Sequence, residues 1–254
     1  MRANSFCLGM TESKSVPALN AQKAEQGKDY FLFDAVSIPE PGNDFFDMAY
    51  WRSQGALIST AQGRAAAAIF RYNDSDYVLR HFRRGGLVAK LSEDKYRWSG
   101  LEKTRAWCEW HLLAKMYQQG LPVPRPIAAH VRRKGVFYTA DLVTLCLPNV
   151  QPLADVLMQQ ALSESEWQRL GMIIRRFHDA GIYHADLNAR NILLDDQGRF
   201  FLIDFDKGEQ RSVDASWQQS NIDRLERSFN KFKNREPCFY FDDQTMRWLN
   251  EGYK

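Results

Sequence analysis

The stretch that decides the fold is His184-Ala185-Asp186-Leu187-Asn188-Ala189-Arg190-Asn191, followed directly by the apolar run Ile192-Leu193-Leu194. A second apolar run, Phe200-Phe201-Leu202-Ile203, leads into Asp204-Phe205-Asp206. Between the two runs, Asp195-Asp196-Gln197-Gly198 has the composition of a tight turn. The pattern therefore predicts a hairpin of two buried strands.

The polar residues around this hairpin are expected to converge. Asp186 and Asn191 precede its first strand and Asp204 follows its second, so all three lie at the same end. Carboxylate and amide oxygens suit Mg²⁺, which keeps some of its waters and bridges phosphates. We predict that Asn191 and Asp204 ligate Mg²⁺ and that Asp186 orients an acceptor hydroxyl or accepts its proton. His184 is expected to brace the loop by packing and hydrogen bonding.

The order H-x-D-x-x-x-x-N, with Asp-Phe 13 residues after the Asn, resembles the phosphoryl-transfer centre of protein kinases. The resemblance implies ATP and Mg²⁺. It also implies an α+β, bilobal protein-kinase-like fold, with an antiparallel sheet lobe that carries one main helix and a mainly helical C-terminal lobe. We expect residues 1–29 to be a disordered leader, residues 30–144 to form the nucleotide-binding lobe and residues 145–254 the catalytic lobe.

Composition excludes several classes of protein. The 254 residues have a net charge of +3, and 44% of them are hydrophobic, which is ordinary for a soluble globular chain. The four cysteines lie far apart with no C-x-x-C spacing, which argues against a zinc site or a disulfide framework. No apolar run approaches the roughly 20 residues that span a bilayer, so any membrane contact is expected to be peripheral. No nucleic-acid partner is expected.

The N-terminal half reads as strands around one long helix. Strands are predicted at 30–33, 56–60, 66–72, 77–82, 127–131 and 136–140, a short aromatic helix at 45–51, and the long helix at 104–119. Gly63 falls in a turn where small residues let backbone amides approach a phosphate. Arg80 is the candidate phosphate-binding cation and Glu109 its helical partner. The alternatives are an ordinary hairpin turn, a solvated strand charge and an exposed helical Glu.

In the C-terminal half, helices are predicted at 153–157, 163–180, 221–234 and 245–253. Ser163 and Glu166 are predicted to form a capping box at the start of the second of them. No Ala-Pro-Glu follows Asp206, and the segment from Lys207 to Ser216 is short and polar, which favours a non-protein acceptor. The third of these helices carries basic residues on one side, which could bind an anionic substrate or form a solvated face: Arg224, Arg227, Lys231 and Arg235.

Beyond the kinase motif, the chain resembles the 3-deoxy-D-manno-octulosonic acid (Kdo) kinases of the lipopolysaccharide core kinase group. The resemblance covers about Tyr30 to the C-terminus, and four blocks carry it: Phe45-Phe46-Asp47 with Tyr50-Trp51, Val78-Leu79-Arg80-His81-Phe82-Arg83-Arg84-Gly85-Gly86-Leu87, Gly120-Leu121-Pro122-Val123-Pro124-Arg125-Pro126, and the opening stretch with Ile203-Asp204-Phe205-Asp206.

The resemblance implies ATP-dependent phosphorylation of the 4-hydroxyl of Kdo on Kdo–lipid IVA, with Asp186 as the catalytic residue. It implies a peripheral location at the cytoplasmic face of the inner membrane of a Gram-negative bacterium, where the membrane surface is anionic. The chain departs from the wider kinase pattern at Arg80 and Asn188, both usually Lys, and at Asp206, usually Gly.

Two other functions stay open at this stage. One is a kinase of a different small molecule, such as a soluble sugar or an aminoglycoside. The other is a nucleotide-binding module without catalysis. Two measurements separate these three functions: phosphorylation of a Kdo–lipid acceptor, and the loss of that activity when Asp186 is replaced.

Overall fold

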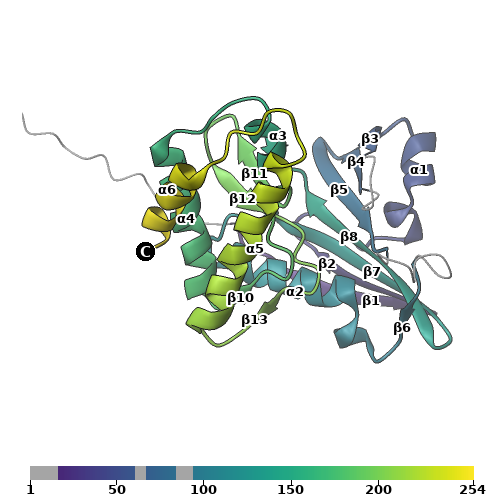
Figure 1. Ribbon diagram of the computed structural model, residues 1–254. Coiled ribbons are helices and arrows are strands. Elements are labelled where there is room, and N and C mark those ends of the chain that lie inside the picture. The colour runs from purple at the N-terminus through teal and green to yellow at the C-terminus, as the bar shows by residue number, and fades with distance from the viewer. Residues whose placement is uncertain (1–16, 61–66, 84–93) are drawn as a thin grey trace, which may run out of the picture.

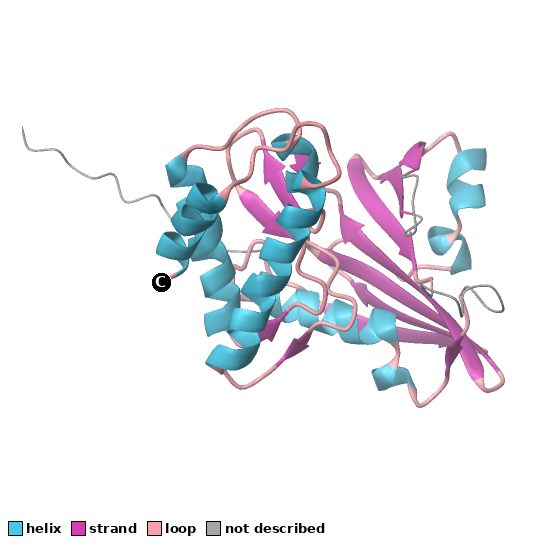
Figure 2. Cartoon of the chain, viewed as in Figure 1, coloured by secondary structure: helices cyan, strands magenta, loops and turns pink. Residues whose placement is uncertain are grey.

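The computed structural model describes residues 17–60, 67–83 and 94–254. Most of the strands lie in one lobe and most of the helices in the other (Figures 1 and 2). The predicted α+β, bilobal kinase-like architecture is confirmed. Within the described residues, no helix is long and apolar enough to cross a membrane.

The sheet lobe is built on one antiparallel sheet with strand order β1-β2-β7-β8-β5-β4-β3 and with β6 paired to β8. Its strands are β1 (Ala21–Gln26), β2 (Asp29–Asp34), β3 (Leu57–Thr60), β4 (Ala67–Tyr72), β5 (Ser75–His81), β6 (Tyr96–Arg97), β7 (Pro126–Lys134) and β8 (Phe137–Leu145). The predicted strand at 136–140 ends too early, because β8 stays paired with β5 and β7 up to its last residues.

Alternating side chains along these strands bury both faces of the sheet. On one face, the main helix α2 (Arg105–Gln118) buries Trp107 and Trp110 in a core cluster that also contains Leu32 and Leu142. On the other face, η1 (Asn43–Phe46) and α1 (Met48–Ser53) cover the strands with a separate, aromatic cluster. A further turn, η3 (Leu101–Lys103), leads into α2. Helix α2 is therefore held against the same sheet that contains Arg80.

The expectation of a disordered leader through residue 29 is wrong for residues 21–29. Residues 21–26 form β1, which pairs along its whole length with β2. Asp34 accepts a hydrogen bond from the backbone of Asn20, and Arg125 donates to the carbonyl of Ala18. Most β1 side chains are exposed, so the strand depends on backbone pairing that a polar composition does not reveal. Residues 1–16 lie outside the described part of the chain.

The helical lobe contains α3 (Leu153–Leu157), α4 (Glu164–Asp179), α5 (Ala215–Lys233) and α6 (Asp243–Tyr253). The predicted capping box of Ser163 and Glu166 starts α4. Helices α4 and α6 cross at two glycines: a Cβ on Gly171 would lie 2.1 Å from the Leu249 carbonyl oxygen. Short strands β9 (Val150–Pro152), β11 (Ile192–Asp195) and β12 (Phe200–Leu202) form one sheet, and β10 (Ile182–Tyr183) pairs with β13 (Glu209–Gln210).

Candidate active site

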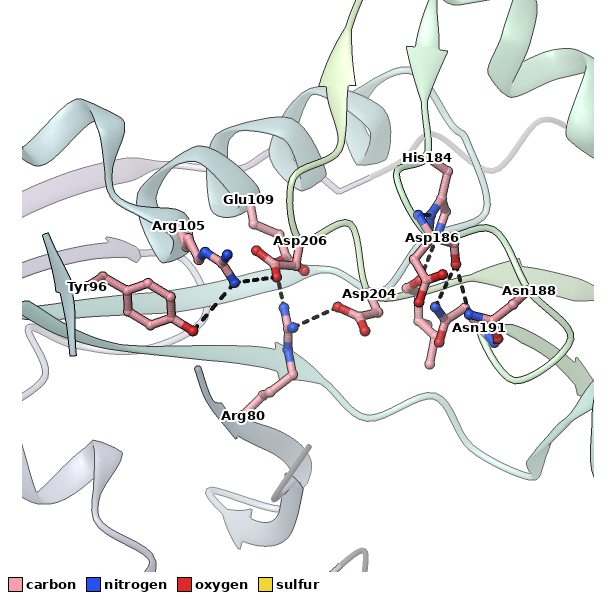
Figure 3. A network of polar contacts seen from close by, with 11 residues as sticks. Arg80, Tyr96, Arg105, Glu109, His184, Asp186, Asn188, Asn191, Asp204 and Asp206 are labelled. Atoms are coloured by element: carbon pink, nitrogen blue, oxygen red, sulfur yellow. Dashed lines mark hydrogen bonds and ion pairs between the residues drawn. The ribbon is translucent and has the colours of Figure 1, made fainter. Parts of the chain in front are cut away.

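The predicted hairpin is confirmed as β11 and β12, with Ile192 opposite Leu202. Just past β12, the backbone of Ile203 joins the two halves of the opening stretch. Its N–H donates to the Asn191 carbonyl at 3.0 Å, and its carbonyl accepts from His184 Nε2 at 3.0 Å. These two bonds hold Asp204, the next residue, against the loop that carries Asp186 and Asn191 (Figure 3).

His184 braces this loop as expected. The ring is buried, and its Nδ1 accepts a hydrogen bond from the Asp186 N–H at 3.1 Å. With Nε2 donating to Ile203, both ring nitrogens are used by the neutral imidazole. Burial lowers the pKa of His184, against the opposing effect of the Ile203 carbonyl. With both ring nitrogens engaged by backbone groups, the ring holds the loop and offers no free nitrogen for proton transfer.

The loop itself is locked by two asparagines. Asn188 Oδ1 accepts from the N–H groups of Arg190 and Asn191, and its Nδ2 donates to the Asp186 carbonyl. Asn191 Nδ2 donates to the same carbonyl at 2.9 Å, which leaves its amide oxygen as the free end. The Asp186 side chain is 65% exposed. The loop thus presents one accessible carboxylate on a rigid backbone.

The predicted pairing of Arg80 with Glu109 is confirmed. Arg80 Nη2 lies 2.5 Å from Glu109 Oε2, and Nη1 lies 2.7 Å from Asp204 Oδ1 (Figure 3). Burial disfavours the charged form of Arg80, yet the carboxylates of Glu109 and Asp204 raise its pKa above the ordinary value. Burial raises the pKa of Glu109 to about 7 despite the opposing charge of Arg80, and Asp204 and Asp206 add to the rise. The carboxylates of Glu109 and Asp204 thus share the single cation of Arg80.

Asp206 belongs to the same cluster, and the sequence pattern assigned it no partner. Its Oδ2 lies 2.8 Å from Arg105 Nη1, at the start of α2, and Arg105 also lies over the ring of Tyr96. Burial raises the pKa of Asp206, while Arg105 and Arg80 oppose the rise. The residue that replaces the usual glycine therefore ties α2 to the segment after β12.

Helix α5 contributes contacts that sequence reasoning missed. Asn221, which is 1% exposed, accepts from the His184 N–H at 3.2 Å and donates to the His184 carbonyl at 3.1 Å. Ser228 accepts from the Ala189 N–H at 3.1 Å, and Arg224 Nη1 lies 3.6 Å from Asp186 Oδ1. The i, i+3, i+7 spacing of these three residues on one helical face was the available signal.

The residues predicted to ligate Mg²⁺ offer one carboxylate and one amide oxygen, from Asp204 and Asn191. Among the described residues, no group of three or more His, Cys, Asp or Glu side chains could hold a metal ion. A two-oxygen site suits a cation that completes its shell with water and phosphate oxygens, and it does not suit an all-protein cage. The donor set therefore fits a magnesium–nucleotide complex.

Gly63, the remaining predicted site residue, lies outside the described ranges, as do residues 84–87 of the second motif block. The structure brings together the other five: Arg80, Glu109, Asp186, Asn191 and Asp204. Two lobes supply them, with Arg80 on β5, Glu109 on α2 and the remaining three on the loops beside the β11–β12 hairpin.

Comparison with known proteins agrees with this geometry. Residues 48–250 match the model of the "Lipopolysaccharide kinase (Kdo/WaaP) family". The chain belongs to this family. The match includes every site residue described above, from Arg80 in the sheet lobe to Arg224 and Ser228 on α5. As a member of the lipopolysaccharide kinase family, the chain is an enzyme of the phosphotransferase class that acts on a hydroxyl group.

Individual relatives align along nearly their whole length. A 3-deoxy-D-manno-octulosonic acid kinase of Haemophilus influenzae (strain PittEE) is 41% identical over 240 residues, covering 91% of this chain and 99% of the relative. A protein of the same name from Vibrio vulnificus (strain CMCP6) is 37% identical over 233 residues, covering 92% and 98%. One from Mannheimia succiniciproducens is 39% identical over 232 residues, covering 89% and 96%.

Proposed function

We propose that this protein transfers the γ-phosphoryl group of ATP to the 4-hydroxyl of Kdo on Kdo–lipid IVA. The observation that carries the proposal is the exposed carboxylate of Asp186 on a loop whose backbone is held rigidly beside Asp204 and Asn191. The names of the relatives support Kdo as the acceptor sugar. The names of the relatives specify neither the lipid part of the acceptor nor the position of the hydroxyl, so we propose both in addition.

Asp186 would act on the acceptor hydroxyl. The acceptor oxygen forms a bond to the γ-phosphorus, and the bond from that phosphorus to the β,γ-bridging oxygen breaks, so that ADP leaves with the electron pair. The hydroxyl proton passes to the carboxylate of Asp186. The exposure of that carboxylate makes it accessible to a sugar, and its fixed backbone positions it for in-line attack.

Arg80 would hold the nucleotide phosphates. Its guanidinium is fixed between Glu109 and Asp204, so its direction is set before a nucleotide binds. A guanidinium keeps its charge in this buried position, which makes an Arg a workable replacement for the usual Lys. Asn191 and Asp204 would hold Mg²⁺, which would supply charge neutralisation on the phosphate oxygens.

The two lobes would divide these tasks, with the nucleotide lobe ending near residue 144 and the catalytic lobe beginning at 145. The end of β8 at Leu145 supports this division. The protein would work peripherally at the cytoplasmic face of the inner membrane, where its lipid acceptor and an anionic surface lie. Three exposed cations on one face of α5, Arg224, Arg227 and Lys231, support contact with such a surface.

The proposal is tested by incubating the enzyme with MgATP and Kdo–lipid IVA and measuring the added phosphate by mass spectrometry. Fragmentation of the product assigns the phosphate to the Kdo ring and to its hydroxyl. The matched control is Asp186→Asn, which removes the base and keeps the shape of the side chain. Transfer to a soluble sugar or an aminoglycoside, with none to Kdo–lipid IVA, would contradict the assignment of the acceptor.

Contact with the membrane is tested separately, by sedimentation with vesicles of phosphatidylglycerol and phosphatidylethanolamine. We expect binding at low salt that weakens as the salt concentration rises. No binding at low salt would favour a soluble acceptor. Thermal stabilisation by MgATP without turnover on any acceptor tried would instead support a non-catalytic nucleotide-binding module.

A further inference from the structure

Arg224 occupies a position that neither the kinase motif nor the hairpin explains. It lies on α5, three residues from Asn221, and its Nη1 is 3.6 Å from Asp186 Oδ1. Its side chain is 43% exposed. A guanidinium has five N–H donors, and within the described part of the chain Arg224 makes one loose contact, to Asp186, so a planar fork is left available to an anion. A cation with free donors thus stands directly beside the carboxylate that is to receive the acceptor hydroxyl.

Arg224 is not needed to hold the loop. The loop backbone is already fixed by Asn221 and Ser228 from α5, by His184 within the loop and by Ile203 after β12. A contact of 3.6 Å between partly exposed groups adds little stability to such a network. We therefore look for the role of Arg224 in the binding of a ligand.

The chemistry of the acceptor supplies one. The sugar named in the relatives is an octulosonic acid, so C1 is a carboxylate, and only C2 and C3 separate it from C4. An anion and the reacting hydroxyl thus lie a short distance apart on one small sugar. We propose that Arg224 binds the carboxylate of the acceptor sugar while Asp186 engages its hydroxyl, which makes Arg224 a specificity-determining residue. This inference rests on the function proposed above.

The alternative role for this cation is contact with the transferred phosphoryl group. The lysine that many kinases carry two residues after the catalytic Asp is Asn188 here, and Asn188 is consumed by hydrogen bonds within its loop. The exposure of the Arg224 side chain favours a role in binding the acceptor. Arg224 is much more accessible than Arg80, the cation that we assign to the phosphates. It also lies on the same face of α5 as the exposed cations Arg227 and Lys231. The two roles differ in how they respond to the charge of the acceptor.

The experiment compares two acceptors, Kdo–lipid IVA with its Kdo carboxylate as the free acid and as the methyl ester, with wild-type enzyme, Arg224→Met and Arg224→Lys at saturating MgATP. Wild type is expected to favour the acid over the ester by about 10-fold or more in kcat/KM, mainly through KM. Arg224→Met is expected to lose that preference, with an unchanged KM for ATP. Arg224→Lys keeps the charge without the fork and should retain part of the preference.

The matched control is Arg247→Met, which removes an exposed arginine from α6 in the same lobe and should keep the wild-type preference. Arg224→Met lowering kcat/KM by the same factor on acid and ester overturns the inference, because the arginine then acts on the phosphoryl group or on the structure. Wild type using acid and ester equally overturns the carboxylate contact and leaves the proposed function standing. Wild type phosphorylating neither overturns both.

Discussion

Replacing Arg80 by Met is the perturbation whose size the structure defines best. The substitution removes a cation that lies 2.5 Å from Glu109 and 2.7 Å from Asp204. The Glu109 side chain is 2% exposed, so water cannot replace the lost partner. Removing one member of a buried ion pair costs about 3–5 kcal/mol. For a chain of this size, that corresponds to a fall in melting temperature of roughly 6–20 °C.

The destabilisation should depend on pH. The pKa of Glu109 is about 7 in the folded protein, above the ordinary value for a glutamate, and loss of Arg80 raises it further. The folded state then holds a proton that the unfolded chain has already lost, so stability falls as pH rises above the unfolded pKa. We expect Arg80→Met to be less stable relative to wild type at pH 8 than at pH 6, measured by urea unfolding.

A double variant separates stability from catalysis. Arg80→Met with Glu109→Gln removes both buried charges, so most of the lost stability should return. Activity should not return, because the cation proposed to bind the nucleotide phosphates is still absent, and kcat should stay about 10²–10³-fold below wild type. A single variant within 1 kcal/mol of wild type at pH 8 would refute the reasoning about burial. Recovery of kcat in the double variant would refute the nucleotide role of Arg80.

Three further predictions concern the loop and the helical lobe. Asp186→Asn should lower kcat by about 10²–10⁴-fold with an unchanged melting temperature, since the side chain is mostly exposed; wild-type kcat would contradict its role. Asn221→Leu removes both hydrogen bonds to the His184 backbone and should cost roughly 2–4 kcal/mol in urea unfolding, whereas a neutral effect would mean that the loop is held elsewhere. Burial lowers the pKa of His178 to about 4, so as the pH falls the unfolded chain binds a proton at this residue before the folded protein does. Between pH 7 and pH 5 the free energy of unfolding should therefore fall by about 2 kcal/mol more for wild type than for His178→Gln. Parallel curves of stability against pH for the two proteins would exclude this.

The local parts of the site were predictable because short-range chemistry specifies them. Two apolar runs joined by a four-residue turn could form only a short hairpin, and its geometry brings Asp186, Asn191 and Asp204 to one end. The pairing of Arg80 with Glu109 was predicted from the resemblance to protein kinases, in which a strand cation at this position pairs with a helical Glu, and the structure shows that pair. The cap at Ser163 is local in the same sense.

What the sequence alone did not reveal depends on residues far apart in the chain. Strand β1 has no apolar alternation and exists because β2 offers it a row of backbone partners. Asp206 meets Arg105 across 101 positions of sequence. Neither contact has a periodic signal in the sequence, because each depends on where two distant elements come to lie.

Helix α5 shows the same division most clearly. Its apolar stripe predicted a helix, and its cations, Arg224 among them, predicted a basic side that could bind an anion. Asn221, however, looked like an ordinary polar position, and no pattern placed Arg224 beside Asp186. Only the packing of α5 against the catalytic loop buries the Asn221 amide on the His184 backbone and brings Arg224 to Asp186. The sequence by itself determined that Asp186, Asn191 and Asp204 meet at one end of a hairpin, because their spacing along the two strands specifies it. The tertiary structure decided which cation stands beside them, because that depends on the docking of a helix more than 30 residues away.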